Sequence, residues 1–152
     1  VLDNVIWLVR VARRVGVPMM ATEQYPKGLG HTHPDLLAEL PPGVMAEKMH
    51  FSCVGAQCLD TGLLAQRRQV VVCGMETHVC VLQTVIDLRL GGHEVFVVAD
   101  AVGSRREADK ALALQRMRDE GARIVSREMV AFEWLRMAGT PLFREISREY
   151  LR

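Results

Sequence analysis

The chain has 152 residues, a net charge of +1 at pH 7 and 49% hydrophobic residues. This length suits one domain with a hydrophobic core, and the balanced charge offers no basic field for nucleic acid. No apolar run approaches the roughly 20 residues of a membrane-spanning helix, so we expect no membrane association. The four cysteines follow no zinc-binding spacing, and their apolar neighbours are typical of reduced thiols in a cytoplasmic protein.

The first half of the chain alternates between helical and extended patterns. Apolar residues recur at helical spacing from Leu2 to Val15, and Gly16 follows them, which predicts a helix that ends there. Strands are expected at 17–22 and 44–46, a loop at 23–34, and helices at 35–40 and 60–69.

The second half repeats this alternation. The β-branched run that begins at Val70 predicts a strand buried on both faces, and Gly74 interrupts it. We expect Thr77 to cap a helix that ends at Gly91, and Ser104 with Glu107 to form the capping box of a later helix. Further strands are expected at 94–99 and 122–126, and further helices at 127–138 and 140–150.

Alternating helices and strands with short connections predict an α/β fold, a doubly wound and mainly parallel sheet with helices on both faces. Opening on a helix is unusual for this class, because the first helix should cross over from an earlier strand. We therefore expect that residues 1–152 form a single domain that is incomplete at its N-terminus and lacks its first strand.

Cys80 is the most suggestive single residue. It is expected in the first turn of a helix that follows a buried strand, where unpaired N–H groups and the helix dipole favour a thiolate. Cys73 lies inside the strand and is expected to belong to the core, and Cys53 and Cys58 are expected to be structural. His78 is a weak candidate for a Cys–His pair, because positions two apart in a turn do not face each other.

The segment from Gly74 to Val81, with Thr77 and Cys80 at fixed spacing, resembles the isochorismatase-like cysteine hydrolase family. Three further stretches carry the same resemblance: residues 22–30, residues 48–52, and Asp87 followed by 97–101. The resemblance covers essentially the whole chain. It implies a Rossmann-like three-layer sandwich with a six-stranded sheet, in which the missing strand lies near the middle and leaves a gap.

The same resemblance implies a catalytic triad of Asp, Lys and Cys. Lys48 and Cys80 match two members, with Cys80 as the nucleophile and Lys48 stabilising its thiolate. The aspartate would belong to the missing strand. A cis peptide bond at Met75–Glu76 is implied as well, with the backbone N–H groups of Glu76 and Cys80 stabilising the oxyanion.

These features predict a metal-independent hydrolase that cleaves the C–N bond of a small amide through an acyl intermediate on Cys80. The cysteine disfavours isochorismate hydrolysis, because relatives with that activity lack it. Phe51, Tyr25 and Thr77 are candidates for lining the substrate pocket. No cofactor is expected.

Several alternatives stay open. The histidines at 31 and 33 with Asp35 resemble a small metal cluster, but no fixed element holds them, so no metal is expected. The chain is expected to be a homo-oligomer, and the apolar residues of its last third are candidates for the interface. A non-catalytic scaffold member of the fold, or a redox-sensing thiol at Cys80, would explain the same sequence differently.

Overall fold

The structure alternates short parallel strands with helices, in the order that the sequence predicts. The computed structural model describes residues 1–151. No helix among these residues is long and apolar enough to cross a membrane. The elements in chain order are α1 (Leu2–Val15), β1 (Ala21–Gln24), α2 (Pro26–Leu29), α3 (Pro34–Leu37), β2 (Met45–Lys48), α4 (Thr61–Gln66), β3 (Gln69–Met75), a π-helical turn η1 (Thr77–Val81), α5 (Leu82–Leu90), β4 (Glu94–Gly103), α6 (Glu107–Asp119), β5 (Arg123–Val125), α7 (Arg127–Leu135) and α8 (Pro141–Tyr150).

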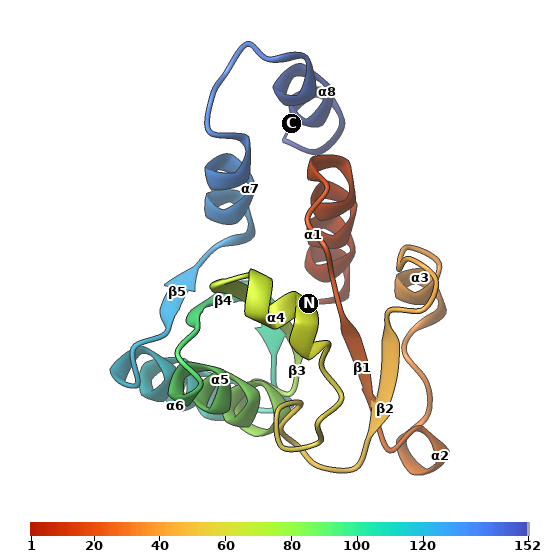
Figure 1. The fold of residues 1–152 in the computed structure, drawn as a ribbon, viewed down its shortest axis with the longest axis vertical. Coiled ribbons are helices and arrows are strands. Elements are labelled where there is room, and N and C mark those ends of the chain that lie inside the picture. Colours follow the sequence, from red (N-terminus) through yellow and green to blue (C-terminus); the bar gives the residue numbers. More distant parts are fainter. Residues whose placement is uncertain (152) are drawn as a thin grey trace.

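The strands form two separate sheets (Figure 1). In the first, β1 pairs in parallel with β2, and Gln24 lies opposite Lys48 at the carboxyl ends of the two strands. In the second, β4 lies between β3 and β5, and all pairs are parallel. The parallel sheet with flanking helices expected from the sequence is therefore confirmed.

The expected gap lies between β1 and β3. Each is an edge strand of its own sheet, and residues of both line one large cavity. The strand that borders the gap on the first side is therefore β1, which ends at Gln24. Lys48 ends β2, one strand further away, so its side chain reaches the gap across the end of β1.

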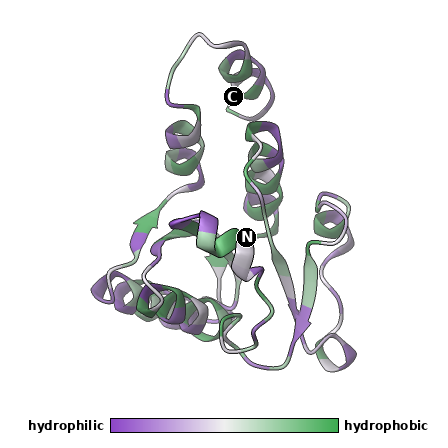
Figure 2. Ribbon diagram, in the orientation of Figure 1, coloured by the Kyte–Doolittle hydropathy of each residue, from purple (hydrophilic) through white to green (hydrophobic). Residues whose placement is uncertain are grey.

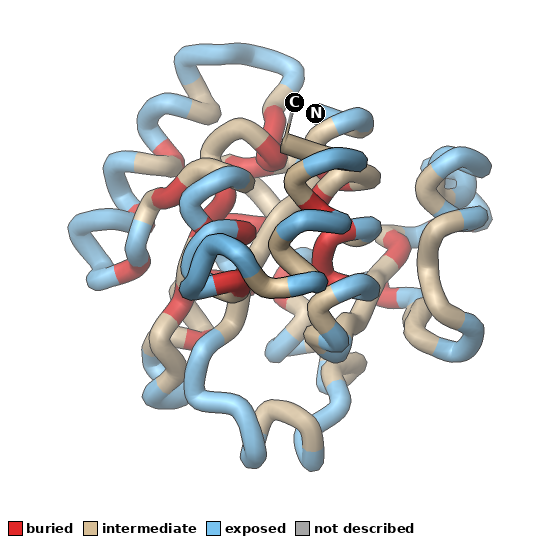
Figure 3. Tube along the Cα trace, turned by 90° about the horizontal axis from the view of Figure 1, so that it is seen from above, coloured by how far each residue is buried: buried red, intermediate tan, exposed pale blue. Residues whose placement is uncertain are grey.

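Three apolar clusters hold the helices against the sheets. One joins α5 and α6 to β3 and β4, a second joins α1 and α7 to the opposite face of the same strands, and a third joins α1, α7 and α8. The buried stretches lie inside the molecule while the connecting loops are exposed (Figure 3). Hydrophobic and hydrophilic residues both occur along α1 and α7 (Figure 2), as helices with one buried side require.

The long strand β4 shows why a run of valines becomes a central strand. Val97, Val98 and Ala101 are fully buried, because helices cover both faces of β4 and strands lie on both of its edges. Such a strand has no solvent-facing side, so its sequence does not alternate between apolar and polar residues.

Two of the predicted helix caps are wrong. The Thr77 hydroxyl caps nothing: it is buried and has no hydrogen-bond partner within the described residues. Helix α6 begins at Glu107 after Arg106, without a side-chain cap, and the Ser104 hydroxyl binds His78 instead. Both residues were assigned to local helix ends, whereas tertiary contacts determine their surroundings.

The C-terminal apolar residues divide between core and surface. Leu135 is buried against α1 and α8, whereas Phe132 and Met137 are exposed. Only the exposed ones are available for an interface between subunits, which stays a prediction.

Candidate active site

The connection from β3 to α5 forms one wall of the candidate site. The Met75–Glu76 peptide bond is cis. The next residues form the π-helical turn η1, in which the N–H of Val81 donates to the carbonyl of Glu76 at 3.2 Å. The sequence predicted an ordinary first α-helical turn here, and this detail is wrong. Wide turns of this kind occur frequently at functional sites, and this one carries Cys80.

Cys80 and Lys48 meet on a single oxygen atom. The Cys80 thiol donates to Oε1 of Gln24 at 3.7 Å, and the Lys48 ammonium donates to the same oxygen at 2.5 Å. The sulfur and the ammonium are therefore at most two hydrogen-bond lengths apart. The two residues selected by the sequence lie in one site, although 32 positions separate them along the chain.

The Lys48 ammonium is buried and fully bonded. Besides Gln24, it donates to the carbonyl oxygens of His50 at 3.1 Å and Phe51 at 2.8 Å, and the residue is 6% exposed. All three acceptors are neutral oxygens, and within residues 1–151 no carboxylate lies within ion-pair distance of this ammonium. A buried cation without a counter-ion is costly, so the site favours an anion beside Lys48.

The loop that supplies these carbonyls is attached to α5, the helix that follows Cys80. The Ser52 hydroxyl donates to the Asp87 carboxylate at 2.6 Å, and the N–H of Cys53 donates to the Thr84 hydroxyl at 3.0 Å. Helix α5 therefore positions both sides of the site: it follows Cys80 directly and anchors the loop that binds Lys48. Residues 48–52 and Asp87, which both carry the family resemblance, are therefore in direct contact.

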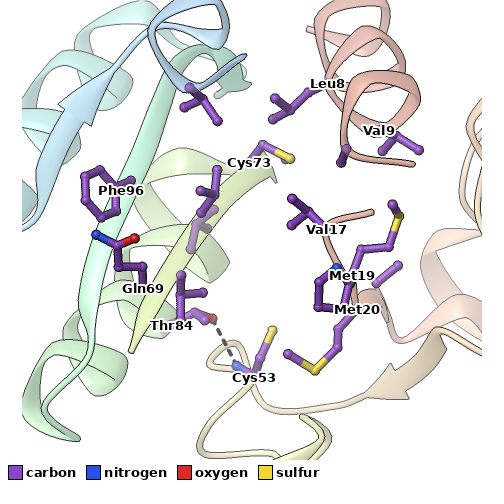
Figure 4. Close-up of a pocket in the computed structure, with 18 of the residues that line it drawn as sticks. Leu8, Val9, Val17, Met19, Met20, Cys53, Gln69, Cys73, Thr84 and Phe96 are labelled. Atoms are coloured by element: carbon purple, nitrogen blue, oxygen red, sulfur yellow. Dashed lines mark hydrogen bonds between the residues drawn. The ribbon is translucent and has the colours of Figure 1, made fainter. Parts of the chain in front are cut away.

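Cys80, Lys48 and Gln24 open onto a cavity of about 1390 Å³ between the two sheets. In Figure 4 its walls are Leu8 and Val9 of α1, the segment that leads into β1, and Cys73 and Phe96 on β3 and β4. Most of these side chains are apolar. The polar groups of the site lie at the carboxyl ends of the strands, where parallel sheets place their functional residues.

The three predicted pocket residues do not line this cavity. Tyr25 and Phe51 are 45% and 50% exposed, and Phe51 contributes its backbone carbonyl to Lys48. Thr77 is completely buried, and its hydroxyl has no partner in the described part of the chain. Contact of these side chains with substrate stays a prediction.

His78 points to a different set of partners from Cys80. Its Nδ1 lies 2.9 Å from the Ser104 hydroxyl, and Glu76 accepts a hydrogen bond from the backbone N–H of Arg105 at 3.0 Å. These contacts attach η1 and the residue before it to the connection between β4 and α6. A Cys–His pair is therefore wrong, for the reason expected from the spacing.

The other cysteines have different surroundings, and all four are free thiols. Cys73 packs among apolar side chains of α1 and β4, and the loss of solvent raises its thiol pKa to about 11. Partial burial also raises the pKa of Cys58, and the neighbouring Cys53 thiol adds to the effect. Neither Cys73 nor Cys58 has an electrostatic environment that favours a thiolate.

The histidine loop makes structural contacts. Glu23 is buried and accepts hydrogen bonds from the Thr32 N–H at 2.8 Å and from His31 at 3.1 Å, while His33 lies near Asp35. The Thr32 N–H and His31 lower the Glu23 pKa. No group of three metal-binding side chains occurs among the residues that the structure describes.

Gln24 is the site residue that sequence reasoning missed. An amide gives little signal of chemistry by itself, so the sequence offers no reason to single it out. The register of β1 and β2 was the missing information, because it places Gln24 beside Lys48.

Comparison with known proteins identifies the family. The model of the isochorismatase domain matches residues 1–129. Mouse isochorismatase domain-containing protein 2A is 40% identical over 142 residues, which are 93% of this chain and 68% of that protein.

Two solved structures extend the similarity to the fold. The MAR1 ribonuclease of Caenorhabditis elegans is 35% identical with a TM-score of 0.91, over 99% of this chain and 78% of the other. YcaC of Pseudomonas aeruginosa, described with covalent acrylamide, is 25% identical with a TM-score of 0.88, over 99% of this chain and 77% of the other. Since the domain model spans most of the chain and the mouse relative is 40% identical, the protein belongs to the isochorismatase family, with its hydrolase fold.

Proposed function

We propose that the protein is a cysteine hydrolase that cleaves the C–N bond of a small amide through an acyl intermediate on Cys80. The observation that carries this proposal is the common contact of the Cys80 thiol and the Lys48 ammonium with Gln24 Oε1. A thiolate is the nucleophilic form of cysteine, and a buried cation within two hydrogen bonds of the sulfur stabilises it.

In the first half of the reaction the sulfur attacks the amide carbon and forms a C–S bond. The negative charge that develops on the carbonyl oxygen would be stabilised by the backbone N–H groups of Glu76 and Cys80, both on the nucleophile turn. One such donor is worth about 2.7–4 kcal/mol in the barrier. The C–N bond then breaks, and the nitrogen leaves as an amine after it takes up a proton.

In the second half water attacks the thioester carbon. The C–S bond breaks, the carboxylic acid leaves and Cys80 returns to its starting state.

The thiol proton must reach the leaving nitrogen, and the family resemblance gives this role to an aspartate. Within the described part of the chain, no carboxylate contacts the Cys80 sulfur or the Lys48 ammonium. Lys48 faces the open cavity, so a carboxylate placed there would compensate its charge and accept the proton. The proposal therefore includes an acidic group at this position.

One solved relative is described with a covalently bound amide. One YcaC structure is described with covalent acrylamide, a small electrophilic amide. Another, from Escherichia coli, is described as an octameric hydrolase of unknown specificity; at 24% identity it is evidence for the fold alone. We propose a homo-oligomer for this chain, with the exposed Phe132 and Met137 as candidates for the interface.

Ribonuclease activity is a second candidate, because the worm relative is described as a ribonuclease. The charge of this chain gives that activity little support, since a net charge of +1 provides no field for a phosphate backbone. The sulfur of Cys80 is also better suited to acyl transfer than to phosphodiester cleavage. RNA cleavage that survives replacement of Cys80 by alanine would favour a separate site.

The experiment that tests the proposal is acyl transfer from a reactive donor. p-Nitrophenyl acetate should give a burst of p-nitrophenolate and an acetyl adduct on Cys80, and a panel of small primary amides should then identify substrates by ammonia release. Cys80→Ala should abolish both signals, whereas Cys73→Ala should retain them. If the wild-type protein forms no adduct, the scaffold alternative gains support. Reversible oxidation of Cys80 without acyl transfer would favour the redox alternative.

A further inference from the structure

Gln24 is the only described side chain that contacts both Cys80 and Lys48. It ends β1, directly beside the last residue of β2, and its position is therefore fixed by the sheet. Its Oε1 accepts from the thiol on one side and from the ammonium on the other. The oxygen is thus placed between the nucleophile and the cation proposed to stabilise it.

The orientation of the amide is determined by a third contact. Nε2 of Gln24 donates to the backbone carbonyl of Met49 at 2.7 Å. A rotated amide would direct its NH₂ group at the Lys48 ammonium, where donor would meet donor, and would leave the Met49 carbonyl facing an oxygen. The hydrogen bonds therefore keep Oε1 towards Cys80.

The charge of Gln24 matters as much as its position. Lys48 is buried, and the three described acceptors of its ammonium are neutral oxygens. A carboxylate at position 24 would bind the ammonium equally well, but it would also place a negative charge within hydrogen-bond distance of the sulfur and oppose its ionisation. A neutral acceptor holds Lys48 close to the sulfur without that repulsion.

We propose that Gln24 is a positioning residue of this site: its neutral amide, oriented by the Met49 carbonyl, holds the Lys48 ammonium beside the Cys80 sulfur without bringing a negative charge there. This inference rests on the proposed function, in which Cys80 is the nucleophile. It adds a requirement for an uncharged acceptor at position 24.

Other titratable groups lie nearby, but their contacts are elsewhere. Cys53 contacts the Thr22 hydroxyl, and Cys58 contacts the carbonyl of Cys53. On the nucleophile turn, Glu76 and His78 are bound to the connection that leads into α6. The donors to the Gln24 oxygen among the described residues are the Lys48 ammonium and the Cys80 thiol, so the variants below act on this interaction.

The test is the pH profile of Cys80 alkylation by iodoacetamide, followed by peptide mass spectrometry. Gln24→Glu keeps the shape of the side chain and adds a negative charge. We expect the midpoint of the profile to rise by about one pH unit or more, which makes alkylation at neutral pH about tenfold slower. The matched control is Gln83→Glu, which adds the same charge three residues after Cys80 on the exposed side of α5 and should leave the midpoint in place.

Thermal unfolding distinguishes this role from a structural one. The new carboxylate can form an ion pair with Lys48, so Gln24→Glu should retain the wild-type melting temperature or exceed it while its thiol reacts more slowly. A structural role predicts that stability and reactivity fall together. Equal alkylation midpoints for Gln24→Glu, Gln83→Glu and the wild type would overturn the proposal.

If Gln24→Glu does not fold, Gln24→Asn provides the same test without a charge. Its side chain is one methylene shorter and cannot reach both partners, so we expect alkylation of Cys80 at neutral pH to slow about threefold or more. An unchanged rate in this variant would refute the inference. The acetyl adduct of the wild-type protein is measured separately, so a failure of this inference leaves the proposed hydrolase intact.

Discussion

Cys73 and Cys80 lie on one continuous segment, and both line the same cavity, yet their surroundings differ completely. Cys73 lies on β3 among apolar side chains of α1 and β4, and its thiol makes no hydrogen bond with another described residue. Cys80 lies on the turn after β3, where the ends of β1 and β2 supply an amide oxygen and an ammonium. The comparison shows that the strand ends, rather than the cavity as a whole, create the chemistry of this site.

The largest expected difference is in the rates of alkylation of the two thiols. Burial raises the pKa of Cys73 to about 11, and thiolate is the reactive form, so little of Cys73 is reactive at pH 7. Iodoacetamide should therefore modify Cys80 much faster than Cys73 at pH 7, and modification of Cys73 should increase as the pH rises. Site-resolved mass spectrometry measures both in one sample. Equal rates at pH 7 would show that the two environments do not differ as described.

Replacement of Lys48 should lower the reactivity of Cys80 towards that of Cys73. Lys48→Met retains much of the side-chain volume but deletes the positive charge that favours an ionised sulfur. We expect Cys80 alkylation at pH 7 to slow by about tenfold and acyl transfer to fall with it. Alkylation of Cys73 is the internal control and should not change. A Lys48→Met protein with wild-type Cys80 reactivity would exclude Lys48 from the site.

The smallest effect is expected at Glu23, the neighbour of Gln24 on β1. Successive side chains of a strand point to opposite faces, and Glu23 binds the His31 loop instead of the thiol site. Glu23→Gln should destabilise the fold by about 1–3 kcal/mol, because an uncharged NH₂ group replaces one of the two carboxylate oxygens that accept from Thr32 and His31. Cys80 alkylation should stay at the wild-type rate, and any slowing would connect this face of β1 to the site.

The stability difference at Glu23 should depend on pH. The folded state lowers the Glu23 pKa below its ordinary value of 4.5, so the stabilisation is complete above that value. It is lost as the pH falls through the lower pKa of the folded state. Urea unfolding at pH 7 and pH 3 should therefore show a larger gap between wild type and Glu23→Gln at pH 7.

Much of the fold was predictable because its signals are local. The stripe of α1 ends at Gly16, which adopts a left-handed conformation with φ 81°. Thr140 and Pro141 begin α8 as expected, with the Thr140 hydroxyl accepting from the N–H of Phe143. Periodicity and capping depend on residues a few positions apart, so the sequence displays them directly.

The predicted caps at Thr77 and Ser104 failed for the opposite reason. Both residues have the chemistry of a cap and the right spacing, but a closer tertiary environment determined their contacts. Ser104, which follows β4, binds His78 of η1. Thr77 is enclosed by the packing of η1 against α6. A capping pattern describes only neighbouring residues, so it cannot predict a contact with a distant part of the chain.

The sequence by itself determined the order of helices and strands, the parallel sheet, and the choice of Lys48 and Cys80. Local periodicity and a recognisable motif are sufficient for these. Only the tertiary structure decided that β1 borders the gap, that the nucleophile turn is a π-helix, and that one amide oxygen of Gln24 joins the thiol to the ammonium. These features depend on strand register and on side chains that meet across separate elements. The spacing of residues along the chain specifies neither the register nor these contacts.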